Sequence, residues 1–151
     1  MARRRGKTEE PTGPTRVLVV DDHADACELI ARIVESAGWT ATRSYSQDDA
    51  LEKLDKGDPP FKAVVVDFQS GGTGASLELL DAIRRNRDLV DIPVLLLTQS
   101  DTNRMFAWES GADAFLVRPF HADDLINEIY AVLTRSTDER DAWREEQLAA
   151  G

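Results

Sequence analysis

The sequence predicts an α/β fold in which a five-stranded parallel sheet is covered by five helices. Five short apolar runs alternate with five segments of helical periodicity, and no hairpin signal joins neighbouring runs. The run Val64–Val66 is apolar at consecutive positions, which is typical of a strand buried on both faces of a parallel sheet. Because parallel neighbours need right-handed crossovers, we expect a doubly wound sheet. A chain of 151 residues has room for one such domain with one core.

The first half of the chain is expected to hold two strands and two helices. The strands are predicted over residues 16–20 and 39–43, and the helices over residues 25–37 and about 47–56. Gly38 follows the first helix as a C-terminal stop, and Ser46 has the position of an N-cap for the second. The buried stripe of the first helix is expected at Leu29, Ile30, Ile33 and Val34.

The second half is expected to continue the alternation three times. The strands are predicted over residues 62–66, 94–97 and 114–117, and the helices over residues 75–86, 101–110 and 121–133. Gly111 follows the fourth helix as its stop. The fifth helix should direct Leu125, Ile129 and Val132 into the core.

Both ends of the chain lie outside the predicted domain of residues 16–135. Residues 1–15 combine a cluster of arginines with two prolines, which is typical of a flexible basic segment. Residues 136–151 mix acidic and basic side chains with Trp143 and Leu148. For this last segment the pattern leaves a short extra helix and a disordered tail both open.

The composition excludes several classes of function. A net charge of -10 argues against nucleic-acid binding, and no direct contact with DNA is expected. No apolar run approaches the length of about 20 residues that a membrane helix needs, and no signal peptide is indicated. The single cysteine, Cys27, is expected in or near the core and cannot form an internal disulfide, which fits a reducing compartment. We therefore expect a cytoplasmic protein.

Acidic side chains follow two of the predicted strands. Asp21 and Asp22 come directly after the first strand, and Asp67 follows the central one. Ligands of open parallel sheets sit at the carboxyl edge of the strands, so these three carboxylates should meet in one crevice. They would repel one another unless a cation offset their charge, and oxygen-only ligation is what Mg²⁺ prefers. The pattern favours a magnesium-dependent aspartyl phosphorylation site.

Several motifs together resemble the receiver domain of two-component response regulators, of the chemotaxis-regulator type. The resemblance covers about residues 16–135 and depends on VLVVDD, VVVD, LLLT and GADAFLVRPF, which contain Asp21, Asp22, Asp67, Thr98, Phe115 and Arg118. It implies a flavodoxin-like sheet with strand order 2-1-3-4-5. It also implies signal transduction through a phosphoprotein, as in a phosphorelay.

The resemblance implies a role for each matched residue. Asp67 would be the phosphoacceptor. Asp22 and Asp67 would bind Mg²⁺ directly with the backbone carbonyl of Gln69, and Asp21 would act through water. Thr98 would donate its hydroxyl to the phosphoryl group, and Phe115 would swing inward when Thr98 moves.

Two further positions, Gln69 and Ser100, are those that tune the lifetime of the acyl phosphate in this family. No lifetime follows from the residues found there. His23 and His121 are predicted to be surface residues and not metal ligands, with His23 near the mouth of the crevice.

Four departures from the family pattern surround the predicted pocket. Arg118 replaces the lysine of the family, and this exchange is not conservative because the guanidinium is a larger planar fork. The loop after Asp67 has three glycines and one extra residue where the family has a proline and a single glycine; it is not a phosphate-binding loop, because it lacks the Gly-Lys-Ser/Thr ending. Gln99 replaces a small residue, and the connection that follows Thr98 is about two residues shorter.

The leading hypothesis is a stand-alone receiver that accepts a phosphoryl group on Asp67 and signals by altered protein binding. Its partners would be a sensor histidine kinase or a phosphotransfer protein, and a downstream target at the face of helix four, strand five and helix five. A homodimer is left open, and no enzyme activity beyond self-phosphotransfer and autodephosphorylation is expected. The alternative is a divergent, phosphorylation-independent binding module. A phosphatase is disfavoured because Gln69 replaces its second acid.

Overall fold

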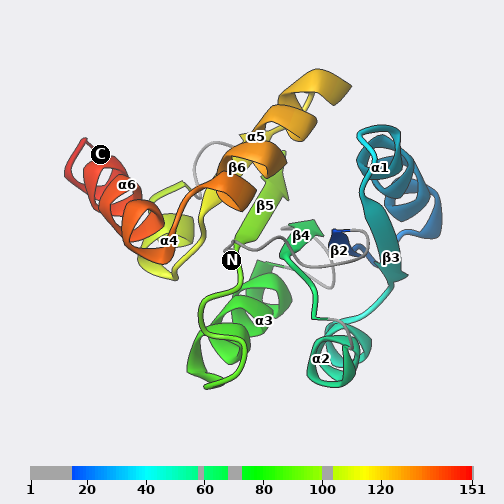
Figure 1. The fold of residues 1–151 in the computed structure, drawn as a ribbon, viewed down its shortest axis with the longest axis horizontal. Coiled ribbons are helices and arrows are strands. Elements are labelled where there is room, and N and C mark those ends of the chain that lie inside the picture. Colours follow the sequence, from blue (N-terminus) through cyan, green and yellow to red (C-terminus); the bar gives the residue numbers. More distant parts are fainter. Residues whose placement is uncertain (1–14, 58–59, 68–72, 100–103, 151) are drawn as a thin grey trace, which may run out of the picture.

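The computed structural model describes residues 15–57, 60–67, 73–99 and 104–150, and its centre is a five-stranded parallel sheet (Figure 1). The strands are β2 (Arg16–Val20), β3 (Thr40–Ser44), β4 (Ala63–Asp67), β5 (Val94–Thr98) and β6 (Ala114–Val117). Their order across the sheet is β3-β2-β4-β5-β6, with every pair parallel. Numbered along the chain this is the order 2-1-3-4-5, so the predicted fold class is confirmed.

The described part of the chain contains six helices, one more than predicted. They are α1 (Ala24–Ser36), α2 (Gln47–Lys56), α3 (Thr73–Arg85), α4 (Arg104–Glu109), α5 (Ala122–Thr134) and α6 (Thr137–Ala150). Helices α1 and α5 cover one face of the sheet, and α2, α3 and α4 cover the other (Figure 1). The predicted count of five was one too low, because the extra helix that the pattern of residues 136–151 left open is formed, as α6.

The register of the sheet brings the ends of β2 and β4 together. Val20 lies opposite Val66 across this parallel pair, so the residues that follow each strand leave the sheet at the same edge. On its other side β4 pairs with β5, where Asp67 lies opposite Leu97. The two acid-bearing strands are therefore neighbours at the carboxyl edge, as the predicted topology requires.

The two faces of the sheet are both apolar, as the consecutive valines predict. Leu18, Val64 and Leu96 point to the side covered by α2, α3 and α4, and Trp108 of α4 packs among them. Val17, Val65 and Leu95 point to the side of α1 and α5, where the predicted residues of α5 are all buried: Leu125, Ile129 and Val132. The three central strands β2, β4 and β5 are therefore buried on both sides, as is typical of a parallel sheet.

The buried face of α1 differs from the predicted stripe. The buried residues are Cys27, Ile30, Ala31 and Val34, at the spacing i, i+3, i+4 and i+7. Leu29 is 62% exposed, because each residue turns the helix by about 100° and Leu29 lies outside that face. The prediction for Leu29 was wrong, whereas the prediction that Cys27 is a core residue is confirmed.

The predicted helix ends have the expected geometry. The Ser46 hydroxyl accepts a hydrogen bond from the Asp49 N–H at 3.1 Å and so caps α2. Gly38 and Gly111 have φ of 95° and 99°, a left-handed conformation that favours glycine after α1 and α4. None of the described helices is both long and apolar enough to span a bilayer.

Candidate functional site

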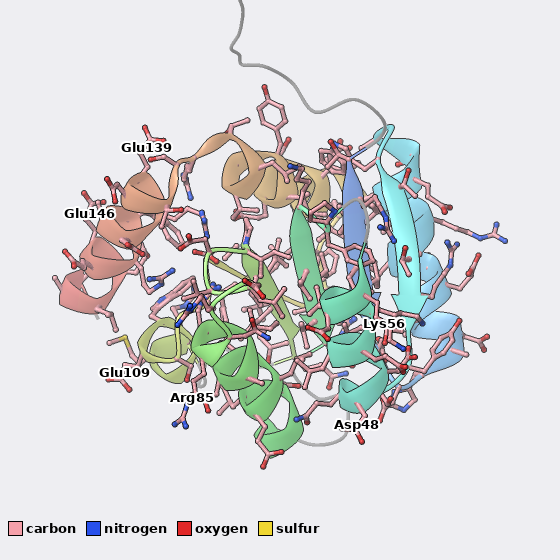
Figure 2. All side chains as sticks on the ribbon, turned by 60° about the horizontal axis from the view of Figure 1, so that its bottom comes forward. Asp48, Lys56, Arg85, Glu109, Glu139 and Glu146 are labelled. Atoms are coloured by element: carbon pink, nitrogen blue, oxygen red, sulfur yellow. The ribbon has the colours of Figure 1, made fainter. Side chains whose placement is uncertain are left out.

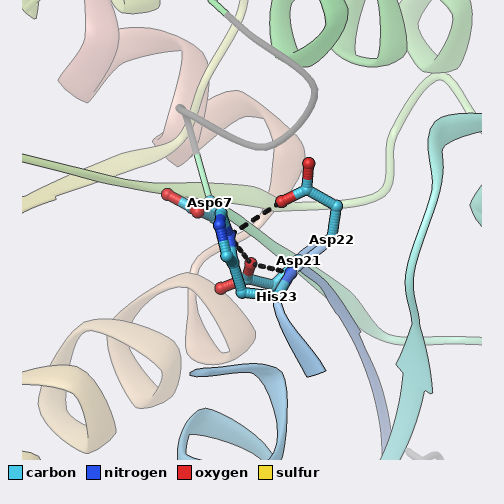
Figure 3. A group of neighbouring side chains, drawn as sticks. All are labelled: Asp21, Asp22, His23 and Asp67. Atoms are coloured by element: carbon cyan, nitrogen blue, oxygen red, sulfur yellow. Dashed lines mark hydrogen bonds and ion pairs between the residues drawn. The ribbon is translucent and has the colours of Figure 1, made fainter. Parts of the chain in front are cut away.

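Three carboxylates and one imidazole converge where β2 and β4 end (Figure 3). Asp21 and Asp22 directly follow β2, and Asp67 is the last residue of β4. One ligand atom from each of Asp21, Asp22, His23 and Asp67 lies within 4.8 Å of the others. The structure thus brings together the three acids that the sequence predicted at one edge of the sheet.

Asp21 lies at the bottom of this group and is 1% exposed. Its Oδ1 accepts a hydrogen bond from the His23 backbone N–H at 2.9 Å, whereas its Oδ2 has no partner among the described residues. Burial raises the pKa of the Asp21 carboxyl, and the charge of Asp67 raises it further, against lowering by the His23 N–H and by Arg118. A buried carboxylate oxygen without a donor fits a position that faces a cation or its bound water.

His23, which was predicted near the mouth of the crevice, contacts two of the acids. Its ring is exposed, and Nδ1 lies 2.9 Å from Asp22 Oδ1 and 3.5 Å from Asp21 Oδ1 (Figure 3). The prediction that it is a surface residue agrees with this exposure. A ring nitrogen also belongs to the group of possible ligand atoms, and the expectation that His23 does not bind a metal stays a prediction.

Arg118 directly follows β6, and its guanidinium forms an ion pair with Asp67. Its Nη1 lies 3.2 Å from Asp67 Oδ1, and both side chains are largely shielded from solvent. The Arg118 backbone N–H donates to the Thr98 carbonyl at 2.7 Å, which holds the residue beside the end of β5. The arginine therefore faces the predicted phosphoacceptor, where the resemblance expects a lysine.

Ser76 of α3 is a site neighbour that sequence reasoning missed. Its buried hydroxyl donates a hydrogen bond to the backbone carbonyl of Asp67 at 2.9 Å. The contact ties α3 to the end of β4. No periodicity or motif marks Ser76, because the partner is a main-chain atom nine residues earlier in the chain.

Thr98 and Phe115 lie on the same face of the sheet. Leu96 pairs with Phe115 and Thr98 with Val117, and side chains two positions apart on a strand share a face. Thr98 is fully buried. Phe115 is 7% exposed, so its ring already occupies an inward position, with the Arg104 guanidinium 4.9 Å from its centroid.

A hollow of about 470 Å³ opens beside the acids. Asp21, Asp67 and Arg118 line its polar end, and Gln99, which is exposed, also lines it. Its apolar wall comes from α1 and from the segment after β6, and includes Leu29, Ile33 and Phe120. Gln69 and Ser100, the predicted metal-ligand and lifetime positions, lie outside the described residues.

The topology and this acidic edge define a class of protein. A family model described as the response regulator receiver domain matches residues 17–130. The chain belongs to this family.

Curated relatives include the phosphate regulon transcriptional regulatory protein PhoB of Klebsiella pneumoniae, 30% identical over 122 residues that cover 80% of this chain and 52% of the relative. The transcriptional regulatory protein TrcR of Mycobacterium tuberculosis is 31% identical over 126 residues, covering 82% of this chain and 47% of the relative. The chain spans about half the length of these relatives.

Solved structures of receivers have the same fold. The receiver domain of the Francisella response regulator 1452 superposes with a TM-score of 0.71 at 26% identity, covering 82% of this chain and 98% of that one. The chemotaxis response regulator CheY4 of Vibrio cholerae gives a TM-score of 0.71 at 23% identity, covering 80% of this chain and 99% of that one. The second likeness bears on the fold alone.

Substituting Asp21→Asn should stabilise the metal-free protein at pH 7 by about 0.5–2 kcal/mol. Because burial raises the pKa of Asp21, ionising this carboxyl opposes folding at any pH above that raised pKa. The gain should shrink as the pH falls through the folded-state pKa, where the wild-type carboxyl becomes neutral. Urea denaturation at a series of pH values measures it. A gain that stays constant down to acidic pH would contradict this account.

Proposed function

We propose that this receiver domain accepts a phosphoryl group on Asp67 in a Mg²⁺-dependent reaction and signals by altered protein binding. The observation that carries the proposal is the arrangement around Asp67, where two further carboxylates lie on one side and the Arg118 guanidinium on the other. Closely packed carboxylates, one of which has a buried oxygen without a hydrogen-bond partner, are typical ligands of a divalent cation. A nearby guanidinium can bind the oxygens of a phosphoryl group.

Asp67 would act as the nucleophile. One carboxylate oxygen forms the new bond to phosphorus, while the bond from phosphorus to the donor's leaving atom breaks and the donor keeps that electron pair. Arg118 would stabilise negative charge on the phosphoryl oxygens, and Thr98 would donate its hydroxyl to one of them. Ser76 holds the backbone of Asp67 in place through its carbonyl.

The residues that would hold Mg²⁺ are Asp22 and Asp67, with Asp21 acting through a water molecule. The third predicted ligand, the Gln69 carbonyl, lies outside the described residues. When bound, Mg²⁺ offsets the negative charge of the carboxylates and of the phosphoryl group. His23 would shift from its contact with Asp22 as that carboxylate turns to the ion.

The phosphoryl donor would be a sensor histidine kinase or a phosphotransfer protein. The hollow beside Asp67 gives it a route, since the apolar wall with the exposed Leu29 can receive an apolar side chain of the donor. A downstream protein would bind the face formed by α4, β6 and α5, with an affinity that depends on phosphorylation. A cytoplasmic location and homodimer formation remain predictions.

Intact mass measurement after incubation with acetyl phosphate tests the proposal. In the presence of Mg²⁺ we expect the mass increase of one phosphoryl group on the wild type, and none with a chelator. Asp67→Ala should carry no adduct, whereas the control Asp141→Ala, an exposed acid on α6, should be phosphorylated like the wild type. Absence of an adduct on the wild type, even with beryllofluoride and saturating Mg²⁺, would overturn the proposal in favour of a phosphorylation-independent binding module.

A further inference from the structure

An unbroken row of aromatic rings joins Phe115 of β6 to α6. The Phe115 ring centroid lies 5.8 Å from that of Trp108 on α4, and Trp108 meets Trp143 of α6 edge-on at 5.0 Å. The Arg135 guanidinium stacks on the Trp143 ring, 5.0 Å from its centroid. Since protein interiors are close-packed, a displacement of the Phe115 ring has to be accommodated by Trp108 and in turn by Trp143.

Polar contacts hold α6 in the same place. Arg144 Nε donates to the Ala112 carbonyl at 3.0 Å, and Arg144 Nη2 lies 2.7 Å from Asp113 Oδ1. Both acceptors directly precede β6, the strand that carries Phe115. Arg140, which is buried, reaches the Asp91 carbonyl at 2.6 Å. Helix α6 therefore contacts α4 through the Trp143 ring, and two arginines attach it to the segments that precede β5 and β6. The ribbons of α4 and α6 lie side by side in Figure 1.

We propose that α6 is an intramolecular output element whose docking on α4 and the phosphorylation of Asp67 favour each other. The expected direction of the coupling depends on the role assigned to Phe115, whose ring is inward while α6 is docked. In that position Phe115 fills the face of the sheet that it shares with Thr98, the residue proposed to contact the phosphoryl group. The inference rests on the proposed function of Asp67.

The coupling is reciprocal by thermodynamic linkage. If a phosphoryl group stabilises the inward Phe115, it stabilises the docked α6, and loss of α6 docking must weaken binding of a phosphoryl analogue by the same factor. Trp143→Ala removes the aromatic contact without changing charge, so electrostatic attraction of an anion is unaffected. Glu146→Gln is the control, since Glu146 lies on the same helix and points away from the body of the protein (Figure 2).

The test combines two measurements on the full chain with beryllofluoride and Mg²⁺ as the probe. Calorimetric titration should show that Trp143→Ala lowers the affinity for the probe by about fivefold or more. The affinity of Glu146→Gln should be unchanged. Hydrogen exchange of the wild type should show slower exchange of the α6 amides when the probe is bound. This second measurement needs no substitution, so it decides the question even if Trp143→Ala does not fold.

The outcomes separate this inference from the proposed function. Wild-type binding with unchanged α6 exchange, or with equal affinity in a folded Trp143→Ala, would overturn the coupling and leave Asp67 as phosphoacceptor. Faster exchange of α6 on binding would reverse its sign and also overturn it. No binding to the wild type would remove the proposed function itself and the coupling with it.

Discussion

Replacing Asp113 by alanine is expected to lower the free energy of unfolding by about 3–5 kcal/mol. The Asp113 carboxylate is fully buried and pairs with three arginines, at 2.6 Å from Arg84, 3.1 Å from Arg140 and 2.7 Å from Arg144. Its Oδ2 also accepts a hydrogen bond from the Val94 N–H at 2.9 Å. Removing this one group leaves several shielded guanidinium charges without their counter-ion, which is the costly way to break a buried pair.

Urea denaturation followed by circular dichroism measures this loss. Asp141→Ala is the matched control, because Asp141 also pairs with Arg144, at 3.1 Å, but from an exposed position. An exposed pair contributes about 0–1 kcal/mol, so this variant should stay close to the wild type. Equal stability of the Asp113 and Asp141 variants would show that the buried cluster does not hold α6 and the start of β6 together.

Arg118→Ala is expected to slow phosphorylation by acetyl phosphate by about 10²-fold at saturating Mg²⁺. The Arg118 guanidinium lies 3.2 Å from Asp67 Oδ1, and it would face the negative charge of the incoming phosphoryl group. Arg118→Lys keeps the charge that the family places here and should lose much less. The rate of adduct formation in a mass-spectrometric time course distinguishes the variants.

A control is needed because Arg118→Ala also makes the chain more negative. Arg32→Ala changes the net charge equally, and Arg32 is an exposed residue of α1 paired with Glu28. It should be phosphorylated at the wild-type rate. If Arg118→Ala reacts as fast as Arg32→Ala, then the arginine has no part in the reaction and the site operates by its acids alone.

The fold was predictable because its signals are local. Consecutive valines mark β4 as a strand buried on both faces, and the observed bounds of the strands differ from the predicted ones by one residue at most. Ser46 and Gly38 act at the helix ends where their side-chain chemistry places them. Leu29 was misplaced because the neighbouring Ile30 and Ile33 allow two overlapping stripes, and only packing against the sheet selects one.

The candidate site was predictable only in part. Asp21, Asp22 and Asp67 follow from strand ends and topology, which bring distant acids to one edge. The contact of His23 with those acids depends on the direction in which its ring turns after β2, which no pattern encodes.

The cluster around Asp113 was missed altogether. Arg84 lies 29 residues and Arg144 lies 31 residues from Asp113 along the chain. No periodicity links positions so far apart, and the charged pattern of residues 137–150 reads equally well as a solvated segment. Pairing across the fold, and not local propensity, decides where α6 lies.

A crystal structure of the chain with Mg²⁺ and beryllofluoride tests the central claim most directly. We expect the beryllium atom on an Asp67 carboxylate oxygen, Mg²⁺ coordinated by Asp22 and Asp67, and Arg118 in contact with a fluorine. Beryllofluoride bound elsewhere, or Mg²⁺ that leaves Asp22 and Asp67 uncoordinated at saturating concentration, would contradict the account of this acidic edge as a phosphorylation site.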